Sequence, residues 1–169
     1  MHEILPWEST VLASNGRCVR DNFRAWFGTS VLVDEHNVPL RMTHGTTADF
    51  DVFLPSMGGA QGPGIYMINS TAPADGDYGV RSLDLVVRMN NPFVFRPTDE
   101  SIDAIINGDL LEQVLGAELA RFVTERIERD GIGAYGTELV ETLRARGHDG
   151  IVMVYPWSAG LLRGDNVVI

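Results

Sequence analysis

The chain has 169 residues, and its 13 basic and 23 acidic side chains give a net charge of −10. With 44% hydrophobic and 21% charged residues, it has the composition of one globular domain that buries enough apolar surface to fold without disulfides. The acidic balance disfavours a broad electrostatic contact with nucleic acid or with an anionic membrane.

Several features of the sequence bear on the compartment in which the protein works. The first residues, MHEILPWEST, contain an acid and a proline and no apolar run, so we expect no signal peptide. Cys18 is the one cysteine and cannot form a disulfide within the chain, which is typical of a reducing compartment. No segment reaches the roughly 20 apolar residues of a transmembrane helix. We therefore expect a cytoplasmic protein that does not bind membranes.

The beginning of the chain predicts a lead-in segment and a short helix. Residues 1–19 have mixed polarity, and we interpret them as a lead-in to a single domain over residues 20–169. Aromatic side chains at helical spacing predict a helix over residues 20–27, with Gly28 as its end.

Short alternating apolar patterns follow this helix. They predict strands over residues 30–34 and 40–44, joined by a turn, and a third strand over residues 65–68. Residues 50–64 are rich in glycine and proline, and we expect a flexible loop there, outside the core. A short helix is predicted over residues 70–77.

The rest of the chain changes from strands to helices and back. Two strands are predicted over residues 82–89 and 92–95, around an Asn-Asn turn. Two helices and two further strands follow, over residues 109–129, 137–146, 151–155 and 167–169. This order of elements predicts an α+β fold.

Common signatures of catalytic and nucleotide-binding sites are missing from the sequence. It contains no GxGxxG between a strand and a helix, no GxxxxGK[ST] loop and no GxSxG elbow. Its four histidines are not paired at i, i+4 or with the cysteine, so we expect no metal site. The remaining candidates are a histidine followed by glycine, two tyrosines beside glycines, and a lone acid before the last strand.

Each of these candidates has both a functional and a structural interpretation. His44 followed by Gly45 can offer an imidazole and bare backbone groups to a ligand such as a carboxamide. Tyr66 and Tyr78 can offer flat faces to a ring. Taken alone, each is explained better by a structural role: a hairpin end, two packed aromatics and, at Asp165, a solvated turn. Their order along the chain is more specific than any one of them.

In this order, the residues resemble the ADP-ribosyltransferase superfamily of the diphtheria-toxin-like and poly(ADP-ribose)-polymerase-like (His-Tyr-Glu) type, especially small transferase domains of phages and mobile elements. The segments that carry the resemblance span roughly half of the chain: FRAWFGTSVLVDEHNVPLRMTHGTTADFDVF, GGAQGPGIYMINSTAPADGDYG, LVVRMNNPFVF and LRARGHDGIVM. The resemblance implies an α+β fold with a split, mainly antiparallel β-sheet core and flanking helices.

The resemblance also implies a role for the residues of the first two motifs. His44 would hydrogen-bond the 2′-hydroxyl of the nicotinamide ribose of NAD, and the backbone of Gly45 would hold the carboxamide. Thr46 matches the residue that often follows. Tyr66 would stack on the nicotinamide ring, and Tyr78 would cover the ring from the other side.

Further positions follow from the same resemblance. Ser70 matches a small polar position between the tyrosines, and the loop that ends at Gly64 would border the NAD site. Asp165 stands at the position of the family's catalytic glutamate, and its carboxylate, one methylene shorter, would stabilise the cation-like ribose as nicotinamide leaves. Arg163 stands where arginine-modifying relatives carry Glu or Gln, which disfavours arginine as the acceptor.

These implications predict a mono-ADP-ribosyltransferase, a phage or bacterial effector that uses NAD as substrate without a metal. We expect its acceptor to be a protein rather than a nucleic acid, and its location to be the host cytoplasm if a phage encodes it. Two alternatives stay open: a NAD glycohydrolase, and an inactive NAD-binding or protein-interaction module. Because dianionic NAD would bind against the net charge of −10, we expect Arg41, Arg81 or another base to offset that field.

Overall fold

The computed structural model describes residues 5–59, 61–69, 79, 81–97, 104–154 and 165–168, with the backbone alone for residues 69, 104–107, 132 and 165–168. The helices are α1 (Val19–Phe27), α2 (Ala104–Leu115), α3 (Ala117–Asp130), α4 (Glu138–Ala145) and the 3₁₀ helix η2 (Ile132–Ala134). The strands are β1 (Arg41–Thr46), β2 (Ile65–Asn69), β3 (Arg81–Val86), β4 (Phe93–Phe95), β5 (Gly150–Met153) and β6 (Asp165–Val168).

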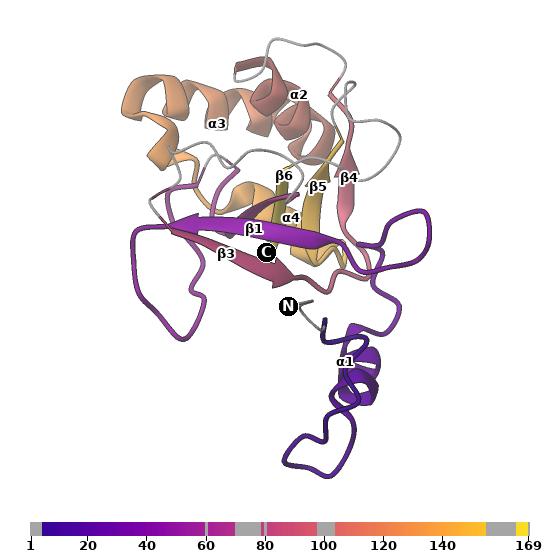
Figure 1. The fold of residues 1–169 in the computed structure, drawn as a ribbon. Coiled ribbons are helices and arrows are strands. Elements are labelled where there is room, and N and C mark those ends of the chain that lie inside the picture. Colours follow the sequence, from indigo (N-terminus) through magenta and orange to yellow (C-terminus); the bar gives the residue numbers. More distant parts are fainter. Residues whose placement is uncertain are drawn as a thin grey trace.

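The described strands form one sheet in the order β3-β1-β2-β6-β5-β4 (Figure 1). Strands β4 and β5 are parallel, and the other neighbouring pairs are antiparallel. A mainly antiparallel sheet with helices packed on it is a mixed α+β architecture, as the sequence predicts. Strands β2 and β6, which are far apart in the sequence, lie side by side in the middle of the sheet.

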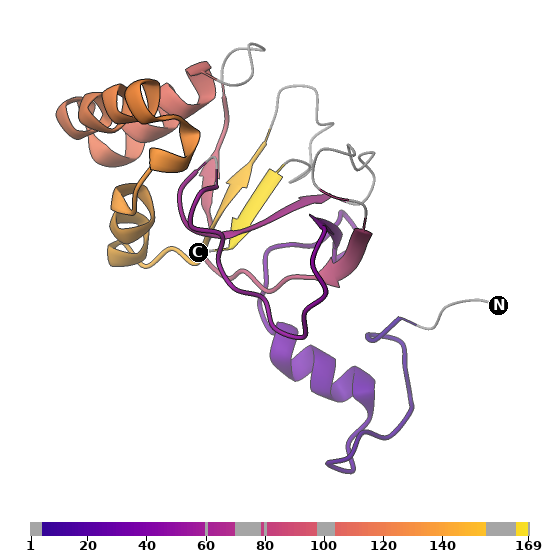
Figure 2. The ribbon, with the colours of Figure 1, turned by 90° about the vertical axis from the view of Figure 1, so that its left-hand side faces the viewer.

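Helices α2, α3 and α4 lie on one side of the sheet (Figures 1 and 2). They bury a first core together with β4 and β5, to which Ile151 and Met153 contribute. Val152 and Val154, which alternate with them, belong to a second core on the opposite face. Strand β5 is therefore buried on both faces, and this explains its unbroken apolar sequence.

Helix α1 stands apart from the other helices, at the opposite end of the molecule (Figure 2). It confirms the helix predicted over residues 20–27 and its end at Gly28, whose N–H donates to the carbonyl of Arg24 over 3.0 Å. The lead-in segment packs on this helix, because the ring of Trp7 lies 5.5 Å from the ring of Phe23, centroid to centroid.

The single helix predicted over residues 109–129 is wrong, because the structure has two helices there. Helices α2 and α3 are separated by Gly116, whose φ of 80° is one that other residues rarely adopt. The apolar periodicity continues across the break because both helices bury side chains in the same core. Periodicity alone therefore could not reveal the break.

The strand predicted over residues 30–34 is also wrong. This segment contributes an isolated bridge between Val33 and Pro39, which closes the predicted turn. Asp34 and Leu32 form backbone hydrogen bonds with Val38 and Leu40 in this turn, whereas the N–H of Val31 donates to the carbonyl of Met89 over 2.8 Å.

The strands predicted around the Asn-Asn turn are present as β3 and β4, but they lie at opposite edges of the sheet. The carboxylate of Asp149 accepts hydrogen bonds from the backbone N–H groups of Asn90 (2.7 Å) and Asn91 (3.1 Å). This contact holds the turn beside the start of β5, so the chain crosses the sheet instead of folding back on β3.

The other predicted elements agree with the structure within a few residues at their ends. These are the strands over residues 40–44, 65–68, 151–155 and 167–169 and the helix over residues 137–146. The helix predicted over residues 70–77 lies outside the described residues. None of the described helices combines the length and the apolar character that crossing a membrane requires.

Candidate active site

His44 and Tyr66 meet at the end of the ladder between β1 and β2. The described pairing of these strands covers two residue pairs, the second of which joins Thr43 to Ile68. One residue further along β1, the Nδ1 atom of His44 lies 2.7 Å from the backbone carbonyl oxygen of Tyr66. A carbonyl oxygen only accepts hydrogen bonds, so Nδ1 carries the proton, and Nε2 is the acceptor of the neutral ring.

The sequence predicts a flexible loop over residues 50–64, but in the structure this loop forms specific contacts. Phe50 and Phe53 turn inward, and their ring centroids lie 6.2 and 5.1 Å from the ring of His44, both nearly edge-on. Gly64 forms two backbone hydrogen bonds, of 2.8 and 3.0 Å, across the loop. The sequence shows two phenylalanines three residues apart here, but nothing in it indicates what their rings contact.

Tyr66 is held at its hydroxyl by the glycine loop, which we define as residues 58–64, with residue 60 outside the described residues. The hydroxyl accepts a hydrogen bond from the N–H of Gln61 (2.9 Å) and donates one to the carbonyl of Gly62 (2.5 Å). A Cβ on Gly59 would overlap the Tyr66 ring, so the loop lies directly against it. Burial raises the pKa of Tyr66 to about 12, and the phenol therefore stays neutral.

The rings of His44 and Tyr66 belong to different sides of the sheet. The Tyr66 ring packs against the first core, on the side of the helices. Met42, two residues before His44 on β1, belongs to the second core, and residues two apart on a strand share a face. The structure therefore brings His44 to the backbone of Tyr66, at the end of the ladder, rather than to its ring.

Gly45 and Thr46 are the last residues of β1, and both pair with β3. Gly79 lies against this end of the strand so closely that a Cβ on it would overlap the carbonyl of Thr46. The chain that follows Tyr78 thus passes the end of β1. Tyr78 itself and Ser70 lie outside the described residues.

Asp165 begins β6, the strand next to β2. Its backbone pairs with Ile68, which pairs in turn with Thr43, the residue before His44. Because neighbouring strands lie about 4.8 Å apart, the backbones of Asp165 and Thr43 are roughly 10 Å apart across β2. The three predicted catalytic residues thus come from three neighbouring strands, and the register places Asp165 on the face of Ile68 and Tyr66 rather than on that of His44.

No protein-family model, no curated protein and no solved structure matches this chain. Within the described part of the chain, no three His, Cys, Asp or Glu side chains lie close enough together to hold a metal ion.

The two arginines expected to offset the acidic field are both engaged by acids. An Nη of Arg41 lies 2.6 Å from a carboxylate oxygen of Asp84, its diagonal neighbour on β3. An Nη of Arg81 lies 2.9 Å from a carboxylate oxygen of Asp49. A dianionic ligand at this end of the sheet would have to compete with these carboxylates for either arginine.

An open groove of about 450 Å³ lies elsewhere in the molecule, beside α1. Its walls come from the lead-in segment, from α1 and from the turn that precedes β1, with Trp7, Phe27 and Pro39 among them. None of the described candidate residues lines this groove.

Proposed function

We propose that the chain is a mono-ADP-ribosyltransferase that breaks the bond between nicotinamide and ribose in NAD and transfers ADP-ribose to a protein side chain other than arginine. The observation that carries this proposal is the hydrogen bond from His44 Nδ1 to the Tyr66 carbonyl, with Asp165 on the next strand. His44 and Asp165 are 121 positions apart in the sequence, and the sheet brings their strands, β1 and β6, to either side of β2, which carries Tyr66.

The tautomer of His44 supports its role toward the ribose. Because Nδ1 donates to the Tyr66 carbonyl, Nε2 can accept a hydrogen bond from the 2′-hydroxyl of the nicotinamide ribose. The edges of Phe50 and Phe53 restrict the rotation of the imidazole. In this proposal, nicotinamide lies where the β1–β2 ladder ends, within reach of the backbone groups of Gly45 and Tyr66.

The reaction needs an anionic carboxylate rather than a group that donates a proton. The bond between ribose C1′ and the nicotinamide nitrogen breaks, and its electron pair leaves with nicotinamide, which changes from a cation to a neutral molecule. The positive charge that develops on the ribose is stabilised by the carboxylate of Asp165. A lone pair of the acceptor side chain then forms the new bond to C1′, and the acceptor loses its proton to solvent.

Incubation with NAD labelled in its adenosine moiety tests the proposal. The protein is incubated alone and with a cell lysate, and free nicotinamide and label on macromolecules are both followed. We expect nicotinamide release and label on protein that resists nuclease and is removed by protease. Label on nucleic acid would correct the acceptor, and nicotinamide release without label would show a NAD glycohydrolase. Binding of NAD without turnover would identify an inactive module, and neither binding nor turnover would overturn the proposal.

A further inference from the structure

The glycine loop that holds the Tyr66 hydroxyl is itself supported by the segment between α3 and α4. A Cβ on Gly58 would lie 3.8 Å from the Cα of Gly133, and a Cβ on Gly62 would lie 2.9 Å from the carbonyl oxygen of Gly136. The second distance is shorter than normal van der Waals contact, so the two backbones approach this closely because Gly62 has no side chain.

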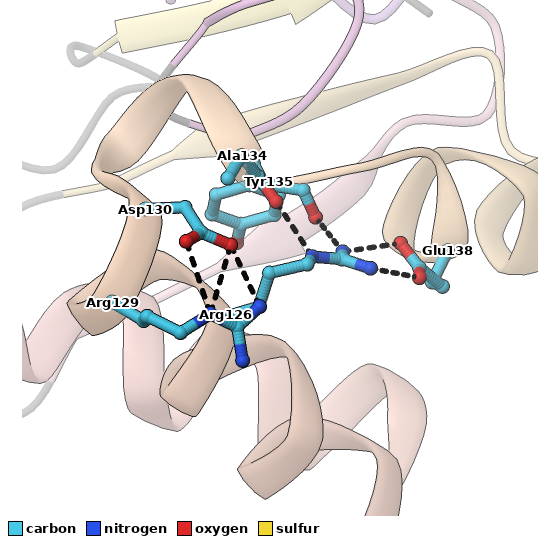
Figure 3. Close-up of polar contacts among 6 residues, drawn as sticks. All are labelled: Arg126, Arg129, Asp130, Ala134, Tyr135 and Glu138. Atoms are coloured by element: carbon cyan, nitrogen blue, oxygen red, sulfur yellow. Dashed lines mark hydrogen bonds and ion pairs between the residues drawn. The ribbon is translucent and has the colours of Figure 1, made fainter.

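Arg126 on α3 holds this supporting segment in place (Figure 3). Its Nε donates to the carbonyl of Ala134 over 2.6 Å, and an Nη donates to the carbonyl of Tyr135 over 2.5 Å. The two Nη atoms also form a bidentate ion pair with Glu138 at the start of α4, at 2.7 and 2.8 Å. One guanidinium therefore connects α3, η2 and α4 through charge-assisted hydrogen bonds.

The backbone of Gly136 lies against this ion pair. A Cβ on Gly136 would overlap the guanidinium of Arg126 and the carboxylate of Glu138. The ion pair thus fixes the peptide whose carbonyl faces Gly62, and Gly62 accepts the hydrogen bond from the Tyr66 hydroxyl. The contacts form a continuous path from Arg126 to Tyr66.

A second arginine on α3 provides a matched control. Arg129 forms an ion pair with Asp130 that is as short, 2.6 Å, but these side chains are 69% and 45% exposed, against 21% and 27% for Arg126 and Glu138. The side-chain hydrogen bonds of Arg129 within the described part of the chain go to the adjacent Asp130. Replacing Arg129 therefore removes a similar charge from the same helix without touching the supporting segment.

We propose that Arg126 is a positioning residue for Tyr66, which acts by holding residues 134–136 against the glycine loop. The consequence for NAD rests on the proposed function, because it requires that nicotinamide contacts Tyr66. The effect on the loop does not rest on it, and the two can be measured separately.

Hydrogen exchange of the full chain measures the effect on the loop. In Arg126→Gln we expect the backbone N–H groups of residues 56–66 to exchange about tenfold faster than in the wild type, because the loop loses its support. Arg129→Gln should leave this segment unchanged. If Arg126→Gln does not fold, Arg126→Lys takes its place, because an ammonium cannot make all four hydrogen bonds of the guanidinium. Unchanged exchange of residues 56–66 in the variant that folds would overturn the proposal.

The KM for NAD measures the effect on the site. In Arg126→Gln we expect the KM to rise about 5- to 10-fold, whereas a loss of folded protein alone would lower kcat at unchanged KM. Tyr66→Phe keeps the ring but removes its bonds to the loop, so the double variant should be no worse than Tyr66→Phe alone. Arg126→Lys, which keeps the charge and a donor, should recover part of the KM.

The outcomes separate the two proposals. If the wild type neither binds nor turns over NAD, the proposed function fails, and the exchange of residues 56–66 alone decides whether Arg126 positions the loop. If the wild type turns over NAD and Arg126→Gln leaves the KM unchanged, or if Arg126→Gln and Tyr66→Phe have additive effects, Arg126 does not act through Tyr66.

Discussion

The Nδ1 atom of His44 donates a hydrogen bond of 2.7 Å to the backbone carbonyl of Tyr66, across the end of the β1–β2 ladder. A backbone acceptor persists whatever side chain occupies position 66, so the orientation of the imidazole depends on the strand pairing rather than on the Tyr66 ring. The strand pairing therefore sets the direction in which Nε2 of His44 faces, and this is the atom that the proposed function uses.

Replacing His44 tests its role toward the ribose. We expect His44→Ala to lower nicotinamide release by about 10²-fold or more, because a positioned hydrogen bond in the transition state is lost. His148→Ala is the control, since Nδ1 of His148 also lies 3.0 Å from a backbone carbonyl and its ring also meets a phenylalanine edge-on. Equal turnover by His44→Ala and the wild type would remove His44 from the site.

Replacing Asp165 tests the assignment of the carboxylate. We expect Asp165→Ala to lower nicotinamide release by about 10²- to 10³-fold, since the developing charge on the ribose loses its anion. Asp165→Glu restores the length found in the family that the sequence resembles and should retain turnover within about tenfold of the wild type. Asp51→Ala, an exposed acid in the loop after β1, is the control. Full turnover by Asp165→Ala would show that another group carries the charge.

Two Tyr→Phe variants should change stability in opposite directions. The Tyr135 hydroxyl is buried and has no hydrogen-bond partner among the described residues, so Tyr135→Phe should raise the free energy of unfolding by about 1 kcal/mol. Tyr66→Phe removes two hydrogen bonds and should lower it by about 1–2 kcal/mol. Urea unfolding measures both. A loss in Tyr135→Phe as large as that in Tyr66→Phe would show that the Tyr135 hydroxyl has a partner.

The ion pair of Arg126 and Glu138 predicts an acid-dependent loss of stability. The hydrogen bonds from Arg126 hold the pKa of Glu138 below its ordinary value of 4.5. A carboxyl with a lowered pKa in the folded state stabilises the protein above its unfolded pKa, and this contribution is lost as the pH falls through the folded value. We expect Glu138→Gln to cost about 1–2 kcal/mol at pH 7 and little once the pH is well below 4.5.

Urea unfolding of both proteins at a series of pH values measures this difference. The control is Asp130→Asn, which removes the exposed ion pair with Arg129 and should cost less at neutral pH. A difference between the wild type and Glu138→Gln that stays constant from neutral to acid pH would contradict the prediction.

Several features of the candidate site were not predictable from the sequence for a physical reason. Phe50 and Phe53 stand in a segment that reads as a loop, and their contact with His44 exists because the chain folds back on β1. Arg126 stands in a helix whose sequence shows an exposed polar face. Its hydrogen-bond partners belong to the 3₁₀ helix η2 and to α4. Such contacts depend on the docking of separate elements, which has no local pattern.

By itself, the sequence determined most of the elements and the mixed α+β class, because periodicity and helix-ending glycines act between neighbours along the chain. It also placed His44 and Tyr66 on strands that the structure makes adjacent. Only the tertiary structure decided the order of the strands, with β3 and β4 at opposite edges, and the position of β6 beside β2. These depend on which apolar faces are buried together and on long-range hydrogen bonds such as those of Asp149. The same physics placed the glycine loop between Tyr66 and Gly136, where bare backbones can meet.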